Sequence, residues 1–448
     1  MFLEDIVSKM EVVKSNISNN IEFENAFLDS RIVTKNSLFF AVKGENTDGN
    51  IYAKTALDNG AACVIMDDEK QYDLIDGNKI LVKNTIDFIK EFGKYRFDNY
   101  SGRKIAVTGS FGKTGMKESL KSIFGEVETV YGTYGNKNNL LGVSLTGCGI
   151  NDKASTIIIE LGSNNVGEIS ELSKLIKPNI ALVTNVGHAH IGRFKSLERI
   201  IFEKLSISDG LNKDGILVAP QFLKPFVPKG DYNFYSFGEA KSASIYMTEY
   251  SHKGEYILFK TSIDNTEYRF NNPYLHVASN LLGAIIVASL CGISSEKIAN
   301  AISKVQIPEG HGNVIKINNM LIINDTYNAG FESIINSAES LDLIDADYKY
   351  AIYGEMGEIE GYERELYNEI TQLAYTYKDI NFYLVGESYL DASSLTNRKI
   401  YKEKNECALE IVNHLKEISK DKKIAIVIKA SRAKKFEEIL EVLKQEIK

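Results

Sequence analysis

A glycine-rich segment at residues 108–114 carries the side chains best suited to chemistry. It reads Thr-Gly-Ser-Phe-Gly-Lys-Thr and lies between an apolar run that predicts a buried strand and a stretch of helical periodicity. In such a turn, backbone N–H groups hold phosphate oxygens, the lysine adds charge at the terminal phosphates, and the threonine hydroxyl can bind Mg²⁺. The usual pattern begins with a glycine where Val107 stands, so this is the shorter TGxxGKT variant. We expect ATP or GTP to bind Gly109, Ser110, Phe111, Gly112, Lys113 and Thr114.

Polar side chains also follow other predicted strands, at the ends where open α/β sheets bind their ligands. Glu160 ends the apolar run STIIIE, His188 and His190 follow ALVTNV, and Asp325 ends LIIND. A carboxylate and an imidazole beside nucleotide phosphates are suitable Mg²⁺ partners. Each such residue alone is more often a local hydrogen-bonding group, and it is their occurrence beside a phosphate loop that favours the metal-binding interpretation.

The composition is that of a folded protein with large cores. The chain has 448 residues, of which 44% are hydrophobic and 25% charged, and only 6 are prolines, so wholesale disorder and collagen-like structure are excluded. There are 52 Lys and Arg residues against 60 Asp and Glu, which gives a net charge of −8. Because no long basic stripe is present, nucleic acid is not expected as the main partner.

Neither membrane insertion nor secretion is expected from the sequence. No apolar run approaches the roughly 20 residues that cross a bilayer, and the acidic N-terminus does not resemble a secretory signal. The four cysteines are widely spaced and form no CxxC pair. We therefore expect a reduced protein of the cytoplasm.

The rhythm of apolar runs predicts the α/β fold class with three domains. Residues 1–102 alternate short apolar runs with helix-like stretches, which predicts a small α/β domain. Residues 103–308 predict a parallel sheet covered by helices, interrupted at residues 232–270 by Tyr-rich segments that look like antiparallel ribbons. Residues 309–448 repeat the α/β rhythm and predict a doubly wound, Rossmann-like domain.

Segments from all three regions resemble the Mur ligase family, the ATP-dependent amide ligases of peptidoglycan assembly. The similar segments are LDSRIVTKNSLFFAVKGENTDG in the first region, YGNKNNLLGVSLT, ELGSNNVGEISEL and TNVGHAHIGRFKSLERIIFEKL in the central one, and NDTYNAGFES, YGEMGEIEG and IKASRAKKFEEIL in the last. Several motifs in the expected order over nearly the whole chain are far more specific than the phosphate loop alone. The resemblance implies that ATP phosphorylates a substrate carboxylate and that an amine attacks the acyl phosphate. The activity that the resemblance implies is the addition of D-alanyl-D-alanine to a UDP-muramoyl-tripeptide.

The same resemblance implies roles for individual residues. For catalysis and metal binding it implies Lys113 at the phosphates, Thr114 and Glu160 at one Mg²⁺, His190 at a second, and Lys204 as a carbamoylated, anionic Mg²⁺ ligand. For ATP it implies Asn280 at the adenine, Asp325 near the ribose, and His311 at the position of an arginine that contacts the nucleotide. For the substrates it implies Ser30, Arg31, Lys43 and Asp48 in a first domain that binds the UDP-linked peptide, Asn138 and Asn139 in a central loop, and Tyr327, Asn328, Lys429, Ser431 and Arg432 in the last domain. The implied cofactors are ATP and Mg²⁺, the amine is an amino acid or dipeptide, and the chain is a monomer.

Several positions depart from the family pattern. The GRME segment is Gly310-His311-Gly312-Asn313 here, so an ATP-contacting arginine is replaced by His311, which lacks its fixed charge and fork geometry. Other departures are Asn50, Gly115, Met116, Ser144, Val277, Gly330 and Phe331. Two alternatives therefore stay open: a paralogue that joins a different acid and amine, and a non-catalytic nucleotide-binding protein. A P-loop switch protein is disfavoured because no guanine-reading NKxD segment is present.

Overall fold

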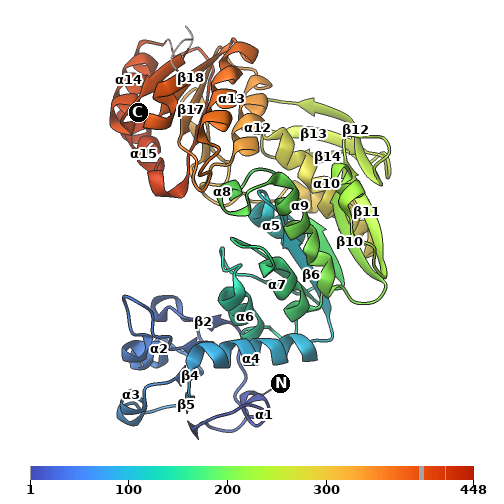
Figure 1. Cartoon of the computed structure of the whole chain (residues 1–448), viewed down its shortest axis with the longest axis vertical. Helices are drawn as coiled ribbons and strands as arrows, with labels where there is room; N and C mark the ends of the chain where they lie inside the picture. The colour runs from blue at the N-terminus through green and yellow to red at the C-terminus, as the bar shows by residue number, and fades with distance from the viewer. Residues whose placement is uncertain (1, 393–397, 419, 448) are drawn as a thin grey trace.

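Three sheets organise the chain, which is described here by a computed structural model covering residues 2–392, 398–418 and 420–447. Within these residues the sheets follow one another along the sequence and along the long axis of the molecule (Figure 1). The predicted α/β fold class is confirmed, because each sheet is mainly parallel and is covered by helices. The domain boundaries at residues 102 and 308 stay a prediction.

The N-terminal sheet is small and mostly parallel. Its strands, in spatial order, are β1 (Lys14–Asn16), β5 (Lys79–Leu81), β4 (Cys63–Met66), β3 (Leu38–Phe40) and β2 (Ala26–Phe27). Its helices are α1 (Leu3–Val7), α2 (Ala53–Asp58), α3 (Glu69–Leu74) and α4 (Thr85–Asn99), with 3₁₀ turns η1 (Ser30–Ile32) and η2 (Gly49–Tyr52). Only β1 runs antiparallel to its neighbour.

The central sheet positions the phosphate loop. Its strands, in spatial order, are β14 (Tyr268–Phe270), β13 (Ile257–Thr261), β12 (Ile245–His252), β11 (Tyr232–Gly238), β10 (Gly215–Pro220), β9 (Ile180–Val183), β6 (Arg103–Thr108), β8 (Thr156–Glu160) and β7 (Val130–Gly132). Its helices are α5 (Lys113–Gly125), α6 (Leu140–Cys148), α7 (Glu168–Ile176), α8 (Ile191–Phe194), α9 (Leu197–Leu205), α10 (Leu275–Leu290) and α11 (Ser295–Ile302), with 3₁₀ turns η3 (Ser206–Gly210) and η4 (Gln221–Phe226). Strands β6, β8 and β9 run parallel, so their carboxyl ends meet at one edge of the sheet.

The expected antiparallel ribbon at residues 232–270 is only partly correct. Strand β11 pairs in parallel with both β10 and β12, and only β12, β13 and β14 pair antiparallel. The alternation of apolar and polar residues is the same for a parallel and an antiparallel strand at a half-exposed edge, so it does not encode direction. Here the crossover through η4 brings the chain back in the same direction as β10.

The C-terminal sheet is the second doubly wound unit. Its strands, in spatial order, are β15 (Asn313–Ile317), β16 (Met320–Asp325), β20 (Ile424–Lys429), β17 (Tyr348–Gly354), β18 (Ile380–Val385) and β19 (Arg398–Tyr401). Its helices are α12 (Phe331–Asp342), α13 (Glu363–Thr376), α14 (Lys404–Glu417) and α15 (Glu437–Glu446), with 3₁₀ turns η5 (Glu387–Ala392) and η6 (Arg432–Lys434). Strand β15 is antiparallel to β16, and the other pairs are parallel.

The N-terminal and central parts are tightly joined by two helices. Helix α4 packs against α6 (Figure 1), and a Cβ added to Gly93 of α4 would lie 2.3 Å from the carbonyl oxygen of Ser144 in α6. The buried Arg96 of α4 pairs with Asp152 at 2.9 Å. Because only a glycine allows this approach, the N-terminal sheet is held in a defined position relative to the phosphate loop. None of the helices in the described part of the chain is both long and apolar enough to span a membrane.

Candidate functional site

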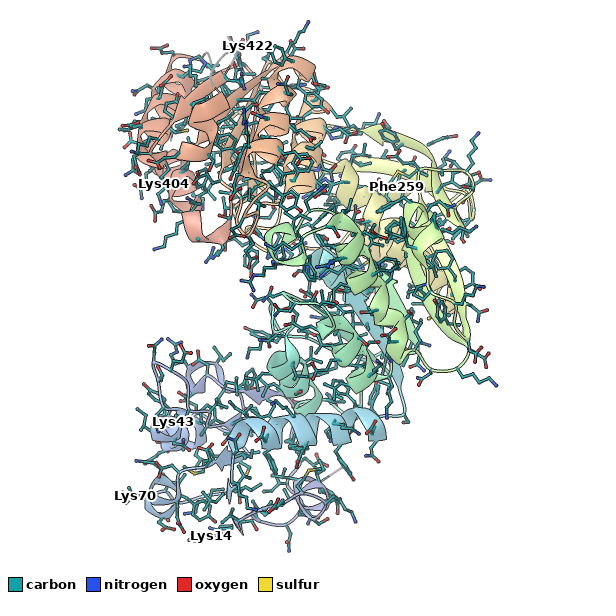
Figure 2. All side chains as sticks on the ribbon, viewed as in Figure 1. Lys14, Lys43, Lys70, Phe259, Lys404 and Lys422 are labelled. Atoms are coloured by element: carbon teal, nitrogen blue, oxygen red, sulfur yellow. The ribbon has the colours of Figure 1, made fainter. Side chains whose placement is uncertain are left out.

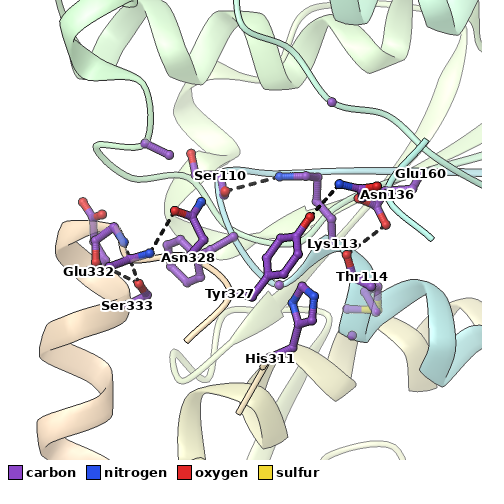
Figure 3. Close-up of a pocket in the computed structure, with 18 of the residues that line it drawn as sticks. Ser110, Lys113, Thr114, Asn136, Glu160, His311, Tyr327, Asn328, Glu332 and Ser333 are labelled. Atoms are coloured by element: carbon purple, nitrogen blue, oxygen red, sulfur yellow. Dashed lines mark hydrogen bonds between the residues drawn. The ribbon is translucent and has the colours of Figure 1, made fainter. Parts of the chain in front are cut away.

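The phosphate loop lines a cavity of about 370 Å³ between the central and C-terminal sheets. Figure 3 shows this cavity, with side chains from both sheets directed into it. The predicted site residues that line it are Ser110, Phe111, Gly112, Lys113, Thr114, Asn138, Asn139, Glu160, His190, Asn280, His311, Asp325, Tyr327, Asn328 and Lys429. The carboxyl ends of β6, β8 and β9 supply one wall, and those of β16 and β20 supply the facing wall.

The backbone of the phosphate loop requires its glycines. Gly112 has φ +80°, caps the N-terminus of α5, and would place a Cβ 2.9 Å from the amide nitrogen of Asn280. A Cβ on Gly109 would lie 2.1 Å from Thr184 Oγ1. Lys113 donates to the carbonyl oxygens of Gly109 at 2.8 Å and Ser110 at 3.3 Å, and burial lowers its pKa. The loop therefore has the shape of a phosphate cradle whose lysine folds over the loop itself.

Glu160, the last residue of β8, is surrounded by donors. Thr114 Oγ1 donates to Glu160 Oε2 at 3.1 Å (Figure 3), and Asn138 Nδ2 donates to Oε1 at 2.8 Å. The ammonium of Lys117, 1% exposed, lies 3.7 Å from Oε2. A carboxylate beside a threonine hydroxyl offers oxygen ligands of the kind Mg²⁺ prefers.

His190 and Lys204 lie on the segment that follows β9. His190 has φ +60° and caps α8, its Nδ1 contacts Glu358 Oε2, and its pKa is lowered chiefly by burial. Lys204, buried in α9, does not line the cavity itself, but its ammonium donates to Oγ of Ser163, which does, at 2.7 Å. Burial, helped by the nearby charge of Lys113, lowers the pKa of Lys204 to about 7. An amine with such a pKa is partly neutral near pH 7 and so can act as a nucleophile.

The C-terminal wall is built around an ion pair. Asp325 and Lys429 are opposite each other in the register of β16 and β20, and Lys429 Nζ lies 2.6 Å from Asp325 Oδ2. Lys429 also donates to the carbonyl oxygen of Asn328 at 3.0 Å, and the hydroxyl of Tyr274 donates to Asp325 at 3.3 Å. Two predicted site residues thus hold each other in position.

His311, which replaces the expected arginine, stacks on Tyr327. Their ring centroids are 4.1 Å apart, at an interplanar angle of 27°. The hydroxyl of Tyr327 accepts a hydrogen bond from Asn136 Nδ2 at 2.6 Å, so this stack joins the C-terminal wall to the central loop (Figure 3). Burial lowers the pKa of His311, which keeps the imidazole neutral at pH 7.

Other predicted residues lie outside the cavity lining. The guanidinium carbon of Arg432 is 5.8 Å from the ring centroid of Tyr327, and its Nη1 lies 3.4 Å from Glu437 Oε1. The neighbouring residue in the sequence, Ser431, is buried. Gly109 is in the loop but not in the lining.

The N-terminal part contains the residues predicted to bind uridine, which are Ser30, Arg31, Lys43 and Asp48. Lys43 is at the opposite end of the molecule from Lys422 (Figure 2). Arg31 is exposed and forms a salt bridge with Asp29, and the backbones of Lys43 and Asp48 form an isolated antiparallel β-bridge. The roles of all these residues stay predictions.

Several residues at the cavity were not predicted to be site residues, namely Glu332, Glu358 and Tyr274 in its lining and Lys117 behind Glu160. Glu332 and Glu358 lie in the segments NDTYNAGFES and YGEMGEIEG, which resembled the family, but nothing in their spacing indicates which central-domain residue each one contacts. The departure at Asn50 has a local explanation. Its amide donates to Asp48 at 2.8 Å and to Asp67 at 3.0 Å, so it fixes the turn before α2.

A phosphate loop that faces a second α/β sheet across one cavity is typical of multidomain nucleotide-binding proteins. The family model described as the Mur ligase middle domain matches residues 107–288, and the model described as the Mur ligase family, catalytic domain, matches residues 22–92. The chain belongs to the Mur ligase family.

Individual relatives cover almost the whole chain. The UDP-N-acetylmuramoyl-tripeptide--D-alanyl-D-alanine ligase of Rickettsia prowazekii is 32% identical over 95% of this chain and 96% of its own length. Among solved structures, MurF from Acinetobacter baumannii is 25% identical with a TM-score of 0.81, covering 94% of this chain and 93% of its own. The MurF ligase of Thermotoga maritima, solved in complex with ADP, is 23% identical with a TM-score of 0.80, covering 96% of this chain and 99% of its own. The latter likeness supports the fold.

Proposed function

We propose that this chain is an ATP-dependent, ADP-forming ligase that joins D-alanyl-D-alanine to a UDP-muramoyl-tripeptide in peptidoglycan synthesis. The observation that carries the proposal is the convergence of Lys113, Glu160 and His190 on one cavity whose facing wall is a second α/β domain. The Rickettsia prowazekii relative carries this activity in its name and aligns over nearly its full length. ATP would phosphorylate the tripeptide carboxylate, releasing ADP, and the dipeptide amine would then attack the acyl carbon and expel phosphate.

The chain's own residues would bind and orient the nucleotide. The N–H groups at the start of α5 would hold the phosphates, and Lys113 would leave the carbonyl oxygens of its loop to neutralise the β and γ phosphates. Asn280, placed next to Gly112, would read the adenine, and Asp325 would lie near the ribose. His311 would contribute a neutral hydrogen bond where the family has a guanidinium.

The oxygen and nitrogen ligands at the cavity fit a Mg²⁺ ion that is bound partly by the protein and partly by the phosphates of the nucleotide. In the described part of the chain, no cluster of three His, Cys, Asp or Glu side chains could hold a metal unaided, which suits an ion that takes one or two protein ligands plus phosphate oxygens. Thr114 and Glu160 would hold one ion, and His190 with Lys204 a second. Mg²⁺ would neutralise the clustered negative charge of the phosphates and the carboxylate.

Lys204 would serve the second ion as a carbamate. Its neutral amine would attack CO₂ and lose one proton, so that an anionic oxygen ligand replaces an ammonium. The supporting observation is a buried lysine whose pKa is lowered to about 7 and whose Nζ bonds Ser163 in the cavity wall.

All three parts of the chain would contact the substrates. Ser30, Arg31, Lys43 and Asp48 would hold the UDP portion of the acceptor, and Asn138 and Asn139 would face the substrates from a central loop. From the last domain, the substrate contacts would be Tyr327, Asn328, Lys429, Ser431 and Arg432. We also propose domain boundaries at residues 102 and 308, and a monomer without nucleic-acid or membrane partners. A cytoplasmic location is supported by four cysteines that are all free in the structure.

The test is ADP release from ATP and Mg²⁺ with both substrates, compared with each substrate alone and with Lys113→Ala. We expect ADP release to require both substrates and to be lost in Lys113→Ala. The mass of the product should include the dipeptide. Nucleotide binding without release would overturn the assignment in favour of a non-catalytic protein.

A ligase for a different acid and amine is the second candidate. It is favoured by His311, which stands in place of an ATP-contacting arginine. It predicts acyl-phosphate formation with other carboxylates, detected as ADP release when a panel of acids and amines replaces the standard pair.

A further inference from the structure

A carboxylate from the C-terminal domain reaches His190 in the central domain. Glu358 lies in the loop between β17 and α13, and its Oε2 contacts His190 Nδ1. Its other oxygen, Oε1, lies 2.8 Å from the guanidinium of Arg193 in α8. Backbone contacts support the same junction, because Gly192 N–H donates to the carbonyl oxygen of Glu358 at 3.1 Å. The carboxylate is therefore held on both sides by the segment that carries His190.

Both partners have an uncommon backbone conformation. His190 has φ +60° and Glu358 has φ +58°, in the left-handed region that few residues other than glycine adopt. Such conformations persist where the surrounding structure holds them, and they gather at functional sites. Here they direct the imidazole and the carboxylate toward each other across the boundary between two domains.

The orientation of the imidazole decides which nitrogen can bind a cation. A histidine that binds a metal through one ring nitrogen almost always donates the N–H of the other to a carboxylate, carbonyl or water, which fixes its tautomer and raises its basicity. In the described structure Nδ1 of His190 is buried and, despite its close contact with Glu358, has no aligned hydrogen bond. A small rotation of the ring would align Nδ1–H with Glu358. The unprotonated Nε2 would then be the nitrogen that binds the metal.

We propose that Glu358 is a positioning residue that orients His190 for metal binding when the C-terminal domain is docked on the central domain. This inference rests on the metal role of His190 in the proposed function and adds a residue that acts through it. It makes the second metal site depend on docking, since the orienting carboxylate comes from the domain that also carries Asp325 and Lys429. Metal affinity and domain position are then coupled through one side chain.

The chain offers a matched control in the same loop. Glu360 is exposed and does not line the cavity, yet its carboxylate also lies at the junction, 2.2 Å from where a Cβ on Gly192 would stand. Replacing Glu360 removes the same charge from the same loop without removing a partner of His190.

The test is Mn²⁺ binding to the full chain with a non-hydrolysable ATP analogue, followed by electron paramagnetic resonance. We expect Glu358→Ala to weaken Mn²⁺ binding about 10-fold to 100-fold, the range for removal of such an orienting group, and Glu360→Ala to bind as the unaltered protein does. In a His190→Ala background, Glu358→Ala should cause no further loss. Thermal unfolding of each variant checks that the fold is intact.

The outcomes separate this inference from the proposed function. If His190→Ala weakens Mn²⁺ binding but Glu358→Ala does not, or if Glu358→Ala has the same effect without His190, the positioning role is wrong and the metal role of His190 stands. If His190→Ala leaves Mn²⁺ binding unchanged, the metal role is wrong and the inference is wrong with it.

Discussion

Glu332 accepts the backbone N–H of His188 with both carboxylate oxygens, each at 3.0 Å, across the boundary between the C-terminal and central sheets. Its Oε1 also lies 2.5 Å from His188 Nδ1, and this hydrogen bond raises the pKa of His188. The preceding residue, Gly187, exchanges two hydrogen bonds with the hydroxyl of Ser110 in the phosphate loop. Two steps of hydrogen bonding therefore connect the C-terminal domain to the residues that cradle phosphate.

Replacing Glu332 with glutamine should loosen this connection. The amide has one acceptor oxygen and no charge, so it loses both the second acceptor for the His188 N–H and the charge-assisted bond to a protonated imidazole. We expect kcat to fall about tenfold, corresponding to roughly 1.4 kcal/mol, which is close to the lower limit for a hydrogen bond to a charged group. Small-angle X-ray scattering with bound nucleotide should show a larger radius of gyration. Glu339→Gln, an exposed change in the same helix, is the control, and equal effects of the two variants would contradict the interpretation.

Carbamoylation of Lys204 should depend on pH and on CO₂. The folded-state pKa is lowered from 10.5 to about 7, so the reactive neutral amine becomes abundant as pH rises through about 7 and is lost as pH falls below it. We expect a ¹³C carbamate signal from labelled bicarbonate at pH 8 that weakens toward pH 6 and is absent in Lys204→Ala. The same variant should lose about 10-fold to 100-fold in activity. Lys174→Ala, an exposed change in α7, should keep both the signal and the activity. An active, unlabelled enzyme would contradict the carbamate.

Site residues could be predicted from the sequence where their position depends only on one strand and the turn that follows it. Lys113, Glu160 and His190 were predicted to lie together because the carboxyl ends of parallel strands share an edge, and they line one cavity. Glu332 and Glu358 were not predicted as site residues. Their partners are more than 140 positions away in the sequence, and the contacts arise from how the central and C-terminal sheets pack against each other.

The direction of β11 could not be predicted for a related reason. A strand at a half-exposed position has the same residue alternation whether its neighbour runs parallel or antiparallel. Its direction is decided by the path through η4, whose irregular sequence carries no periodic signal.

Restoring the family's arginine should strengthen nucleotide binding. His311 is neutral because burial lowers its pKa, so a guanidinium at this position would add a fixed positive charge beside the phosphates. We expect His311→Arg to lower the Kd for ATP about threefold to tenfold at low salt, with a smaller gain at high salt because the added term is electrostatic. Isothermal titration at two ionic strengths measures this. His311→Gln, which adds no charge, should not bind ATP more tightly, and a gain in that variant would point to packing on Tyr327 instead.

The junction of α4 and α6 should be intolerant of a single methyl group. A Cβ on Gly93 would lie 2.3 Å from the carbonyl oxygen of Ser144, whereas a Cβ on Gly125 meets nothing within 4 Å. Alanine favours helices by about 1 kcal/mol over glycine, so Gly125→Ala should raise the free energy of unfolding by up to that amount. Gly93→Ala should instead lower it by about 1–3 kcal/mol, because backbone atoms of two helices must separate. Urea unfolding of both variants measures the difference. If Gly93→Ala were as stable as Gly125→Ala, the two helices would separate without cost, and the N-terminal sheet would not be held in a fixed position relative to the phosphate loop.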